Sequence, residues 1–308
     1  MASTSFKIGR TTLNVSNLEK ILYPEAGFTK ADVIHYYLRI APTLLPHMKA
    51  RALTLKRYPN GVDQEFFYEK RCPIHRPDWV STAEIQSGRS GNRINYCVVE
   101  DAPTLAWVAN LASLELHTLL SKVSDPDRPT MMVFDLDPGP PANVIDAGRI
   151  ALRLRDLLAG LGLESFVKTS GGKGIHMAVP LNTPCTFDDT KSFSHAIAMM
   201  LEQQDPKGIV SKMSKALRKG KVFVDWSQND EHKTTVCVYS LRARPQPTVS
   251  TPITWRELET AVKRADPSLI SFEADDTIKR ADSKGDLWAP VLKLKQRLPR
   301  IEALARSA

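Results

Sequence analysis

The chain of 308 residues is long enough for about two domains of ordinary size. Its composition, 42% hydrophobic and 25% charged, is typical of a globular protein and excludes collagen, a coiled coil or a disordered chain as the main architecture. The formal net charge of +8 favours a polyanionic partner without saying which one.

Neither a membrane span nor a secretion signal is evident. No apolar run approaches the roughly 20 residues that span a bilayer, and the first ten residues, MASTSFKIGR, lack an apolar signal core. The four cysteines, Cys72, Cys97, Cys185 and Cys237, lie far apart without paired spacing. We therefore expect a cytoplasmic protein with reduced thiols and no membrane partner.

The first part of the chain predicts two helices and a hairpin. A capping box at Thr29 marks the start of the first helix. In the segment 51–68, an Asn-Gly pair favours two strands joined by a turn. A second helix is expected from Pro103 to about Lys122, because proline suits a first turn, with His117 on its polar face. A lone histidine in such a place is more often a surface or hydrogen-bonded residue than a catalytic one.

The rest of the chain predicts alternating strands and helices after a turn-rich break at residues 124–129. The expected strands are 131–137, 166–168, 175–180, 221–226 and 234–241, and the expected helices are 143–159, 188–203 and a short one that begins at Thr254. This order favours an α/β fold of the α+β kind, with a mainly antiparallel sheet flanked by helices. We expect lobes at about 1–125 and 126–250, and a C-terminal helical segment at about 251–308.

Two aspartates, Asp135 and Asp137, end the apolar strand that begins at Met131. Side chains two apart on a strand share a face, so both carboxylates project together. Such close like charges repel unless a cation lies between them, and hard divalent ions prefer oxygen ligands. Asp225, late in another apolar strand, is a candidate third ligand for one or two metal ions. The alternative is that these aspartates only cap the turns after the strands.

A glycine-rich turn precedes the strand at 175–180. Its glycines let the backbone approach a ligand, and its lysine adds positive charge, so the turn suits phosphate. It is neither a P-loop nor a dinucleotide fingerprint, because a strand rather than a helix follows. The alternative is a tight hairpin with an incidental lysine. The candidate phosphate-binding residues are Ser170, Gly171, Gly172, Lys173 and His176.

Basic and aromatic residues also alternate around the first hairpin and late in the chain. Lys56 precedes the turn, and Phe66 and Phe67 follow it, an arrangement that can stack bases and hold phosphates. The alternative is a hairpin packed on the core. Arg242 and Arg244 share one face of an extended segment and are candidate phosphate ligands, or a solvated edge.

The combined motifs resemble those of the archaeo-eukaryotic primase superfamily and, more narrowly, the polymerase domain of bacterial ATP-dependent DNA ligase D. The resemblance covers nearly the whole chain. The segments that carry it are 133–138, 170–176, 224–226, 57–63, 106–109 and 241–244. It implies two packed α/β lobes: an N-terminal lobe with DNA-end contacts and a catalytic lobe similar to an RNA-recognition sheet.

The resemblance also implies site residues and cofactors. It makes Asp135, Asp137 and Asp225 ligands of two manganese or magnesium ions, and it places the triphosphate on the turn that carries Ser170, Lys173 and His176. Further implied contacts to the nucleotide and metal centre are His117, Arg242, Phe66 and Phe67. The implied ligands of a DNA 5′-phosphate across a gap are Lys20 and Lys30.

The resemblance implies a nucleotidyltransferase that adds ribo- or deoxyribonucleotides to a 3′-hydroxyl at gaps and double-strand-break ends. Its partners would be gapped or primer-template DNA, nucleoside triphosphates, a DNA-end-binding Ku protein and the ligase and nuclease domains of a larger ligase D, in the bacterial nucleoid. The chain carries no Lys-x-Asp-Gly motif of an adenylating ligase. It is therefore expected not to seal nicks. It would be either a fragment of a larger ligase D or a free-standing relative.

Three alternatives remain open. The first is a primase that starts chains de novo. The second is a haloacid-dehalogenase-like phosphatase, which also ends a strand in Asp-x-Asp, but Gly139 stands where those enzymes usually carry Thr or Val. The third is a non-catalytic scaffold for DNA ends, against which the intact carboxylates and phosphate turn argue.

Overall fold

The computed structural model describes residues 3–87, 91–301 and 304. The chain forms two compact units, each built from separate segments. Unit 1 comprises Met1–Leu119, Thr234–Ser250 and Phe272–Asp286, and unit 2 comprises Leu120–Lys233, Thr251–Ser271 and Leu287–Ala308. The residues expected to form a C-terminal segment, 251–308, are thus divided between the two units.

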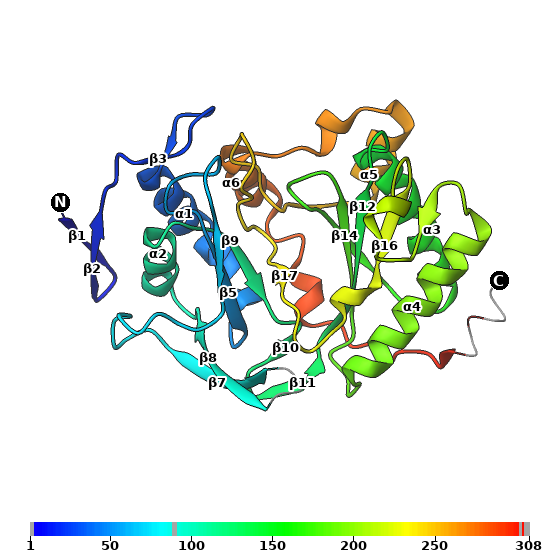
Figure 1. The fold of residues 1–308 in the computed structure, drawn as a ribbon, viewed down its shortest axis with the longest axis horizontal. Helices are drawn as coiled ribbons and strands as arrows, with labels where there is room; N and C mark the ends of the chain where they lie inside the picture. The colour runs from blue at the N-terminus through cyan, green and yellow to red at the C-terminus, as the bar shows by residue number, and fades with distance from the viewer. Residues whose placement is uncertain (1–2, 88–90, 302–303, 305–308) are drawn as a thin grey trace. The chain divides into compact units, whose positions relative to one another are not determined.

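Unit 2 is built on a six-stranded sheet with the order β15-β16-β12-β14-β13-β18 (Figure 1). Its neighbouring strands are antiparallel except for the parallel pair of β15 and β16. The strands are β12 (Met131–Pro138), β13 (Phe166–Thr169), β14 (Ile175–Pro180), β15 (Ile209–Val210), β16 (Val222–Asp225) and β18 (Pro252–Ile253). A small hairpin of β10 (Ser121–Lys122) and β11 (Asp125–Pro129) precedes the sheet.

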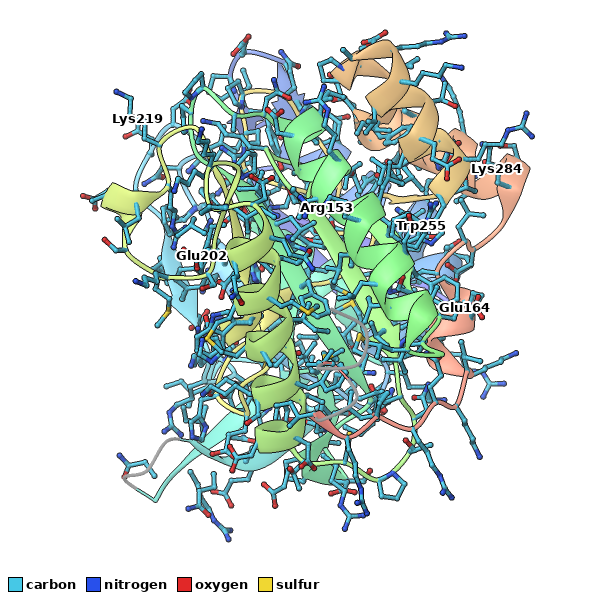
Figure 2. All side chains as sticks on the ribbon, turned by 90° about the vertical axis from the view of Figure 1, so that its right-hand side faces the viewer. Arg153, Glu164, Glu202, Lys219, Trp255 and Lys284 are labelled. Atoms are coloured by element: carbon cyan, nitrogen blue, oxygen red, sulfur yellow. A yellow bond between two sulfur atoms is a disulfide. The ribbon has the colours of Figure 1, made fainter. Side chains whose placement is uncertain are left out.

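Helices α3 (Val144–Gly160) and α4 (Phe187–Gln204) cover one face of this sheet, and α5 (Trp255–Arg264) packs on α3. Figure 2 shows α3 and α4 side by side, with Arg153 on the first and Glu202 on the second. Capping boxes begin all three helices, and the one at Thr254 agrees with the helix start that the sequence predicts. Short 3-10 helices complete the unit: η1 (Lys215–Leu217), η2 (Trp226–Gln228), η3 (Pro267–Ile270) and η4 (Ala289–Leu292).

Unit 1 is built on the antiparallel sheet β17-β9-β5-β8-β7, with β6 also paired to β5. Its strands are β5 (Ala52–Arg57), β6 (Phe67–Glu69), β7 (Thr82–Ser87), β8 (Asn92–Val98), β9 (Ser113–Thr118) and β17 (Thr235–Val236). Two hairpins join β1 (Ser3–Ile8) to β2 (Thr11–Ser16) and β3 (Ile21–Tyr23) to β4 (Phe28–Thr29). The helices are α1 (Lys30–Met48), α2 (Ala102–Asn110) and α6 (Ala274–Lys284).

The expected start of the first helix and the expected hairpin are confirmed. Thr29 caps α1 in a capping box with Asp32. β5 pairs with β6, and the turn at Gly61, whose φ is +94°, lies in the longer connection 58–66. The fold class is confirmed as well, because the structure is a mixed α/β fold with mainly antiparallel sheets.

The helix expected from Pro103 to Lys122 is wrong in its second half. α2 ends at Asn110, and β9 follows, so His117 lies on a strand. Ala112 breaks the helix with a φ of +55°, a left-handed conformation that a helix cannot continue through. The segment Ser-Leu-Glu-Leu-His alternates polar and apolar residues as a strand does, but Asn110, Ser113, His117 and Ser121 also recur at helical intervals, so periodicity alone does not decide between helix and strand here.

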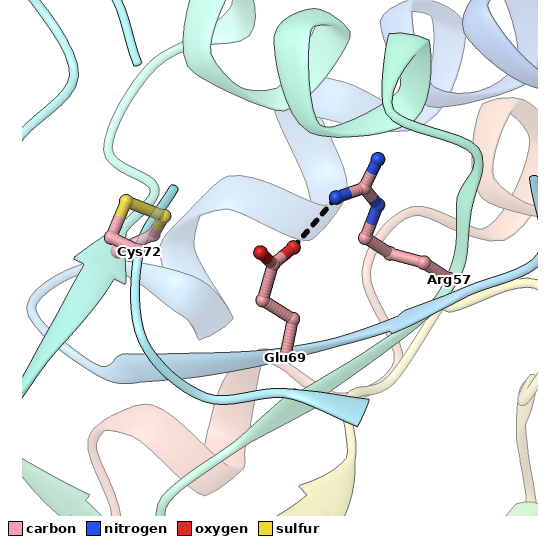
Figure 3. The surroundings of a disulfide bond; sticks show 4 residues. Arg57, Glu69 and Cys72 are labelled. Carbon is pink, nitrogen blue, oxygen red and sulfur yellow. Dashed lines mark hydrogen bonds and ion pairs between the residues drawn. A yellow bond between two sulfur atoms is a disulfide. The ribbon is translucent and has the colours of Figure 1, made fainter. Parts of the chain in front are cut away.

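The expectation of four reduced thiols is also wrong. Cys72 and Cys97 form a disulfide, with their Cα atoms 4.8 Å apart (Figure 3). The pairing follows from the fold, because the Cys72 N–H donates to the carbonyl of Asn95, two residues before Cys97 on β8. Spacing along the chain gives no sign of this contact. Cys185 and Cys237 are free cysteines.

None of the helices within the described ranges combines the length and apolar character that crossing a bilayer requires.

Candidate functional site

A row of four charged or titratable side chains crosses the sheet of unit 2. Lys168 on β13 pairs in register with His176 on β14, His176 pairs with Asp135 on β12, and Asp135 pairs with Asp225 on β16. Paired residues on antiparallel strands point to the same face, with Cβ atoms about 5 Å apart. The sheet therefore brings Asp135 and Asp225 together from distant parts of the chain.

Asp137 lies on the same face as Asp135, two residues further along β12. Both aspartates are partly exposed, whereas the alternate residues Phe134 and Leu136 are fully buried. The expectation that both carboxylates project from one face at the end of a core strand is thus confirmed.

Asp135 and Asp225 have local partners in this structure. Asp135 Oδ1 lies 3.1 Å from His176 Nε2. Asp225 accepts hydrogen bonds from the Ser227 N–H at 2.9 Å and from Gln228 Nε2 at 3.1 Å, and so caps η2. Among the described residues, no group of three or more His, Cys, Asp and Glu side chains is arranged to hold a metal ion. The alternative role of a strand-end aspartate, which is to cap the turn after the strand, is therefore present at Asp225. Metal binding stays a prediction.

Lys168 is a residue of this row that sequence reasoning missed. Its side chain is buried, and Nζ lies 3.0 Å from His176 Nδ1. An ammonium group can only donate, so Nδ1 accepts and the imidazole proton is on Nε2, the nitrogen that lies 3.1 Å from Asp135 Oδ1. Lys168 thereby orients the ring. A lysine within an apolar strand was the available signal, but its partner appears only from the register of β13 and β14.

The glycine turn is organised by the side chain of Ser170. Its Oγ accepts hydrogen bonds from the N–H groups of Gly172 and Gly174, both at 3.1 Å. Gly171 has a φ of +67°, which favours glycine. Lys173 is exposed at the tip of the turn. The turn therefore offers the Lys173 ammonium to solvent, while the Gly172 and Gly174 N–H groups bond within the turn.

Gly174 also sets the turn against β12. A Cβ atom at this position would lie 2.4 Å from the carbonyl oxygen of Leu136 on β12. Only a residue without a side chain allows so close an approach of the two backbones. The third glycine of the motif thus holds the turn beside Asp135 and Asp137.

A second cluster lies in unit 1 and surrounds Glu115 on β9, which sequence reasoning also missed. The carboxylate is 3.2 Å from Lys56 Nζ, 3.0 Å from His117 Nε2 and 3.3 Å from Arg242 Nε. It also accepts a hydrogen bond from the Ala243 N–H at 3.2 Å. Three predicted nucleotide-contacting side chains therefore meet at one carboxylate. The signal for it was a charged residue between two leucines of a buried strand.

Burial and charge shape the titration of this cluster. Burial alone would raise the pKa of the Glu115 carboxyl, but the hydrogen bond from His117 and the charges of Arg242 and Lys56 outweigh it and hold the pKa below its usual range. Burial lowers the pKa of His117 and of Lys56, although Glu115 opposes both shifts. Glu115 is thus ionised at neutral pH, and His117 is neutral.

Exposed aromatic side chains flank the Glu115 cluster. Phe66 and Phe67 are 48% and 44% exposed, so the alternative that this hairpin packs on the core does not hold for them. Lys56 Nζ lies 4.4 Å from the ring centroid of Phe66. Tyr68 stands edge-on to His117, with ring centroids 6.1 Å apart. Arg244 is exposed in the segment after β17.

The two lysines expected at a DNA 5′-phosphate are neighbours in unit 1. The Lys30 N–H donates to the carbonyl of Lys20, and the Lys20 side chain donates to Asn60 Oδ1 at 2.9 Å. Lys30 Nζ donates to the carbonyl of Ser16 at 2.8 Å. Burial and the charges of Lys20 and Arg57 lower the pKa of Lys30 to about 8. The two lysines are thus in backbone contact, and the charge of Lys20 acts on the Lys30 ammonium.

The model of the LigD primase-polymerase domain matches residues 29–288 of the chain. The chain belongs to this family. It is 42% identical over 281 residues to the multifunctional non-homologous end joining protein LigD of Mycolicibacterium smegmatis. This match covers 91% of the chain and 36% of that protein. It is 33% identical over 274 residues to the bifunctional LigD of Bacillus subtilis, covering 89% of the chain and 43% of the relative.

A solved structure agrees with this assignment. The polymerase domain of Mycobacterium tuberculosis ligase D, determined in complex with DNA, superposes with a TM-score of 0.84 at 38% identity, over 92% of the chain and 99% of that domain. The chain spans well under half the length of the LigD proteins that it resembles. The recognised family and the fold class are therefore those that the sequence motifs predict.

Replacing Gly174 by alanine tests the close approach of the LigD-family glycine turn to β12. The new Cβ would meet the Leu136 carbonyl, so we expect the free energy of unfolding to fall by about 1–3 kcal/mol. Gly160→Ala is the matched control, because a Cβ at Gly160 meets no atom within 4 Å. Urea denaturation of both variants measures the difference, and equal stability of the two would contradict the packing described.

Replacing Lys168 by methionine tests its hold on His176. Methionine fills a similar volume but cannot donate to Nδ1, so the imidazole proton should no longer be confined to Nε2. Nitrogen NMR of ring-labelled protein distinguishes the two tautomers. Lys191→Met, which breaks an ion pair with Asp230 in the same unit, is the control and should leave His176 unchanged. An unaltered His176 tautomer in Lys168→Met would refute this role.

Proposed function

We propose that the chain is the polymerase part of a LigD protein and adds nucleotides to a DNA 3′-hydroxyl during non-homologous end joining. Family membership and the likeness to a ligase D polymerase domain that binds DNA support a nucleotidyltransferase. The observation that carries the proposal is the register that sets Asp135 opposite Asp225, with Asp137 on the same face. Carboxylates gathered in this way are the groups that metal-dependent nucleotidyl transfer uses.

The donor set of unit 2 fits hard divalent cations. Asp135, Asp137 and Asp225 supply only carboxylate oxygens from one sheet face, and such ligands suit Mn²⁺ and Mg²⁺ alike. These residues would hold two ions, once Asp225 exchanges its hydrogen bonds with Ser227 and Gln228 for a metal. When bound, the ions lower the pKa of the attacking hydroxyl and stabilise the charge on the leaving phosphates.

The substrate is a ribo- or deoxyribonucleoside triphosphate. The exposed rings of Phe66 and Phe67 provide faces on which a base can stack. Lys56, Arg242 and Arg244 provide positive charge for phosphates, as does Lys173 at the tip of the glycine turn. His176, held by Lys168, has its Nε2 3.1 Å from Asp135 Oδ1 and so lies beside that carboxylate.

The DNA partner is a gapped duplex or a double-strand-break end. Lys20 and Lys30 lie next to each other, and a 5′-phosphate carries the charge that two adjacent ammonium groups attract. The related proteins are multifunctional and much longer, so we include ligase and nuclease domains and a Ku protein among the proposed partners. The proposed location is the bacterial nucleoid. The family that matches is not that of haloacid-dehalogenase phosphatases, and no observation favours de novo priming.

The decisive assay incubates a primer-template, Mn²⁺ and labelled ribonucleotide with wild type and Asp137→Ala. Loss of one metal-binding carboxylate removes stabilisation of the transition state, so we expect nucleotide addition to fall by on the order of 100-fold or more. DNA affinity should stay unchanged. Asp127→Ala, which removes an exposed carboxylate on β11, should extend the primer like wild type. Near-normal extension by Asp137→Ala would refute the assignment.

DNA ends test the pair of lysines. A duplex end with a recessed 5′-phosphate should bind more tightly than the same end without it, by roughly tenfold, which corresponds to about 1.4 kcal/mol. Lys20→Ala should abolish this difference, whereas Lys263→Ala, on α5, should preserve it. Fluorescence anisotropy at constant salt measures the six affinities, those of three proteins for two DNA ends. If wild type ignores the phosphate, the proposed end-binding site is wrong.

A further inference from the structure

Glu115 stands out because it is a carboxylate buried to 2% exposure in the middle of a β-strand. Glutamate is almost never fully buried unless it is paired. Its neighbours Leu114 and Leu116 are fully buried and point to the opposite face of the strand, so Glu115 is a buried charge on the face that also carries His117. Such a residue costs free energy to desolvate, and that cost calls for an explanation beyond the stability of the sheet.

The two oxygens of the carboxylate divide the surrounding hydrogen-bond and ion-pair contacts between them. Oε1 lies 3.2 Å from both Lys56 Nζ and the Ala243 N–H. Oε2 lies 3.0 Å from His117 Nε2 and 3.3 Å from Arg242 Nε. Three separate segments of unit 1, namely β5, β9 and the residues after β17, are therefore tied to one carboxylate.

This arrangement fixes both charge and protonation in the cluster. Lys56 and Arg242 are both cations and would repel each other without the negative charge of Glu115. Because Glu115 is ionised and can only accept, the contact with His117 requires the imidazole proton on Nε2. The second ring nitrogen, Nδ1, is then an acceptor.

Replacing a buried ion pair by apolar residues is often neutral or stabilising, so pairing alone does not account for Glu115. The groups that it holds are those that the proposed function assigns to the nucleotide. We propose that Glu115 is a positioning residue for nucleotidyl transfer, holding Lys56, His117 and Arg242 in the one arrangement that the reaction uses. This inference rests on the proposed function.

The test compares Glu115→Gln with Glu69→Gln. Glu69 lies on β6 of the same sheet and pairs with Arg57 at 2.8 Å, so it is a matched paired glutamate outside the cluster (Figure 3). Glutamine keeps the shape of Glu115 but removes its charge. We expect kcat for ribonucleotide addition to fall 10- to 100-fold. The KM for the nucleotide should stay equal or decrease, because the cluster gains net positive charge. Glu69→Gln should match wild type within twofold.

A residue with only a structural role would give a different pattern. In that case the KM would rise together with the loss of kcat, or kcat would not change, and either result overturns the inference. Nitrogen NMR of His117 is the second readout: the proton should be on Nε2 in wild type and in Glu69→Gln, and should redistribute in Glu115→Gln. An unchanged His117 in Glu115→Gln also overturns the inference.

The same measurements separate this inference from the proposed function. A wild-type protein that adds no nucleotide overturns the proposed function, and with it the positioning role of Glu115 in that reaction. If wild type is active and Glu115→Gln has the same kcat, only the inference is overturned. If Glu115→Gln does not fold, Glu115→Asp replaces it. Aspartate keeps the charge on a shorter side chain, and an intermediate loss of kcat at unchanged KM is then the expected result.

Discussion

The antiparallel register of β14, β12 and β16 is the constraint on which the candidate metal site depends. It places His176 opposite Asp135 and Asp135 opposite Asp225. A slip of β12 by one residue would turn its aspartates into the helix-covered core and expose Phe134 and Leu136. The burial of that apolar face under α3 and α4 therefore keeps the carboxylates together on the opposite face.

Each unit also buries one charged residue within a sheet strand. Lys168 in unit 2 contacts His176, and Glu115 in unit 1 contacts Lys56, His117 and Arg242. Both contacts determine which nitrogen of a histidine carries the proton, because an ammonium only donates and a carboxylate only accepts. The buried charges of Lys168 and Glu115 thus orient neighbouring polar side chains. The family resemblance connects these side chains with the nucleotide and the metal.

Local sequence patterns predicted local structure well. The capping box at Thr29, the hairpin around Gly61 and the shared face of Asp135 and Asp137 all depend on residues a few positions apart. The helix drawn through His117 was wrong for a related reason. The segment Ser-Leu-Glu-Leu-His of β9 alternates polar and apolar residues, but its polar residues also fit helical spacing with Asn110 and Ser121, and the break at Ala112 is a backbone conformation that alanine does not signal.

The sequence by itself determined the family, the fold class and the candidate carboxylates, because motifs, caps and strand periodicity are properties of neighbouring residues. Only the tertiary structure decided that Cys72 joins Cys97, that Lys168 contacts His176 and that Glu115 gathers three cationic or titratable side chains. It also showed Asp225 capping η2. These contacts arise from the pairing of strands and loops that are distant along the chain, and the register of that pairing is set by the packing of the whole sheet.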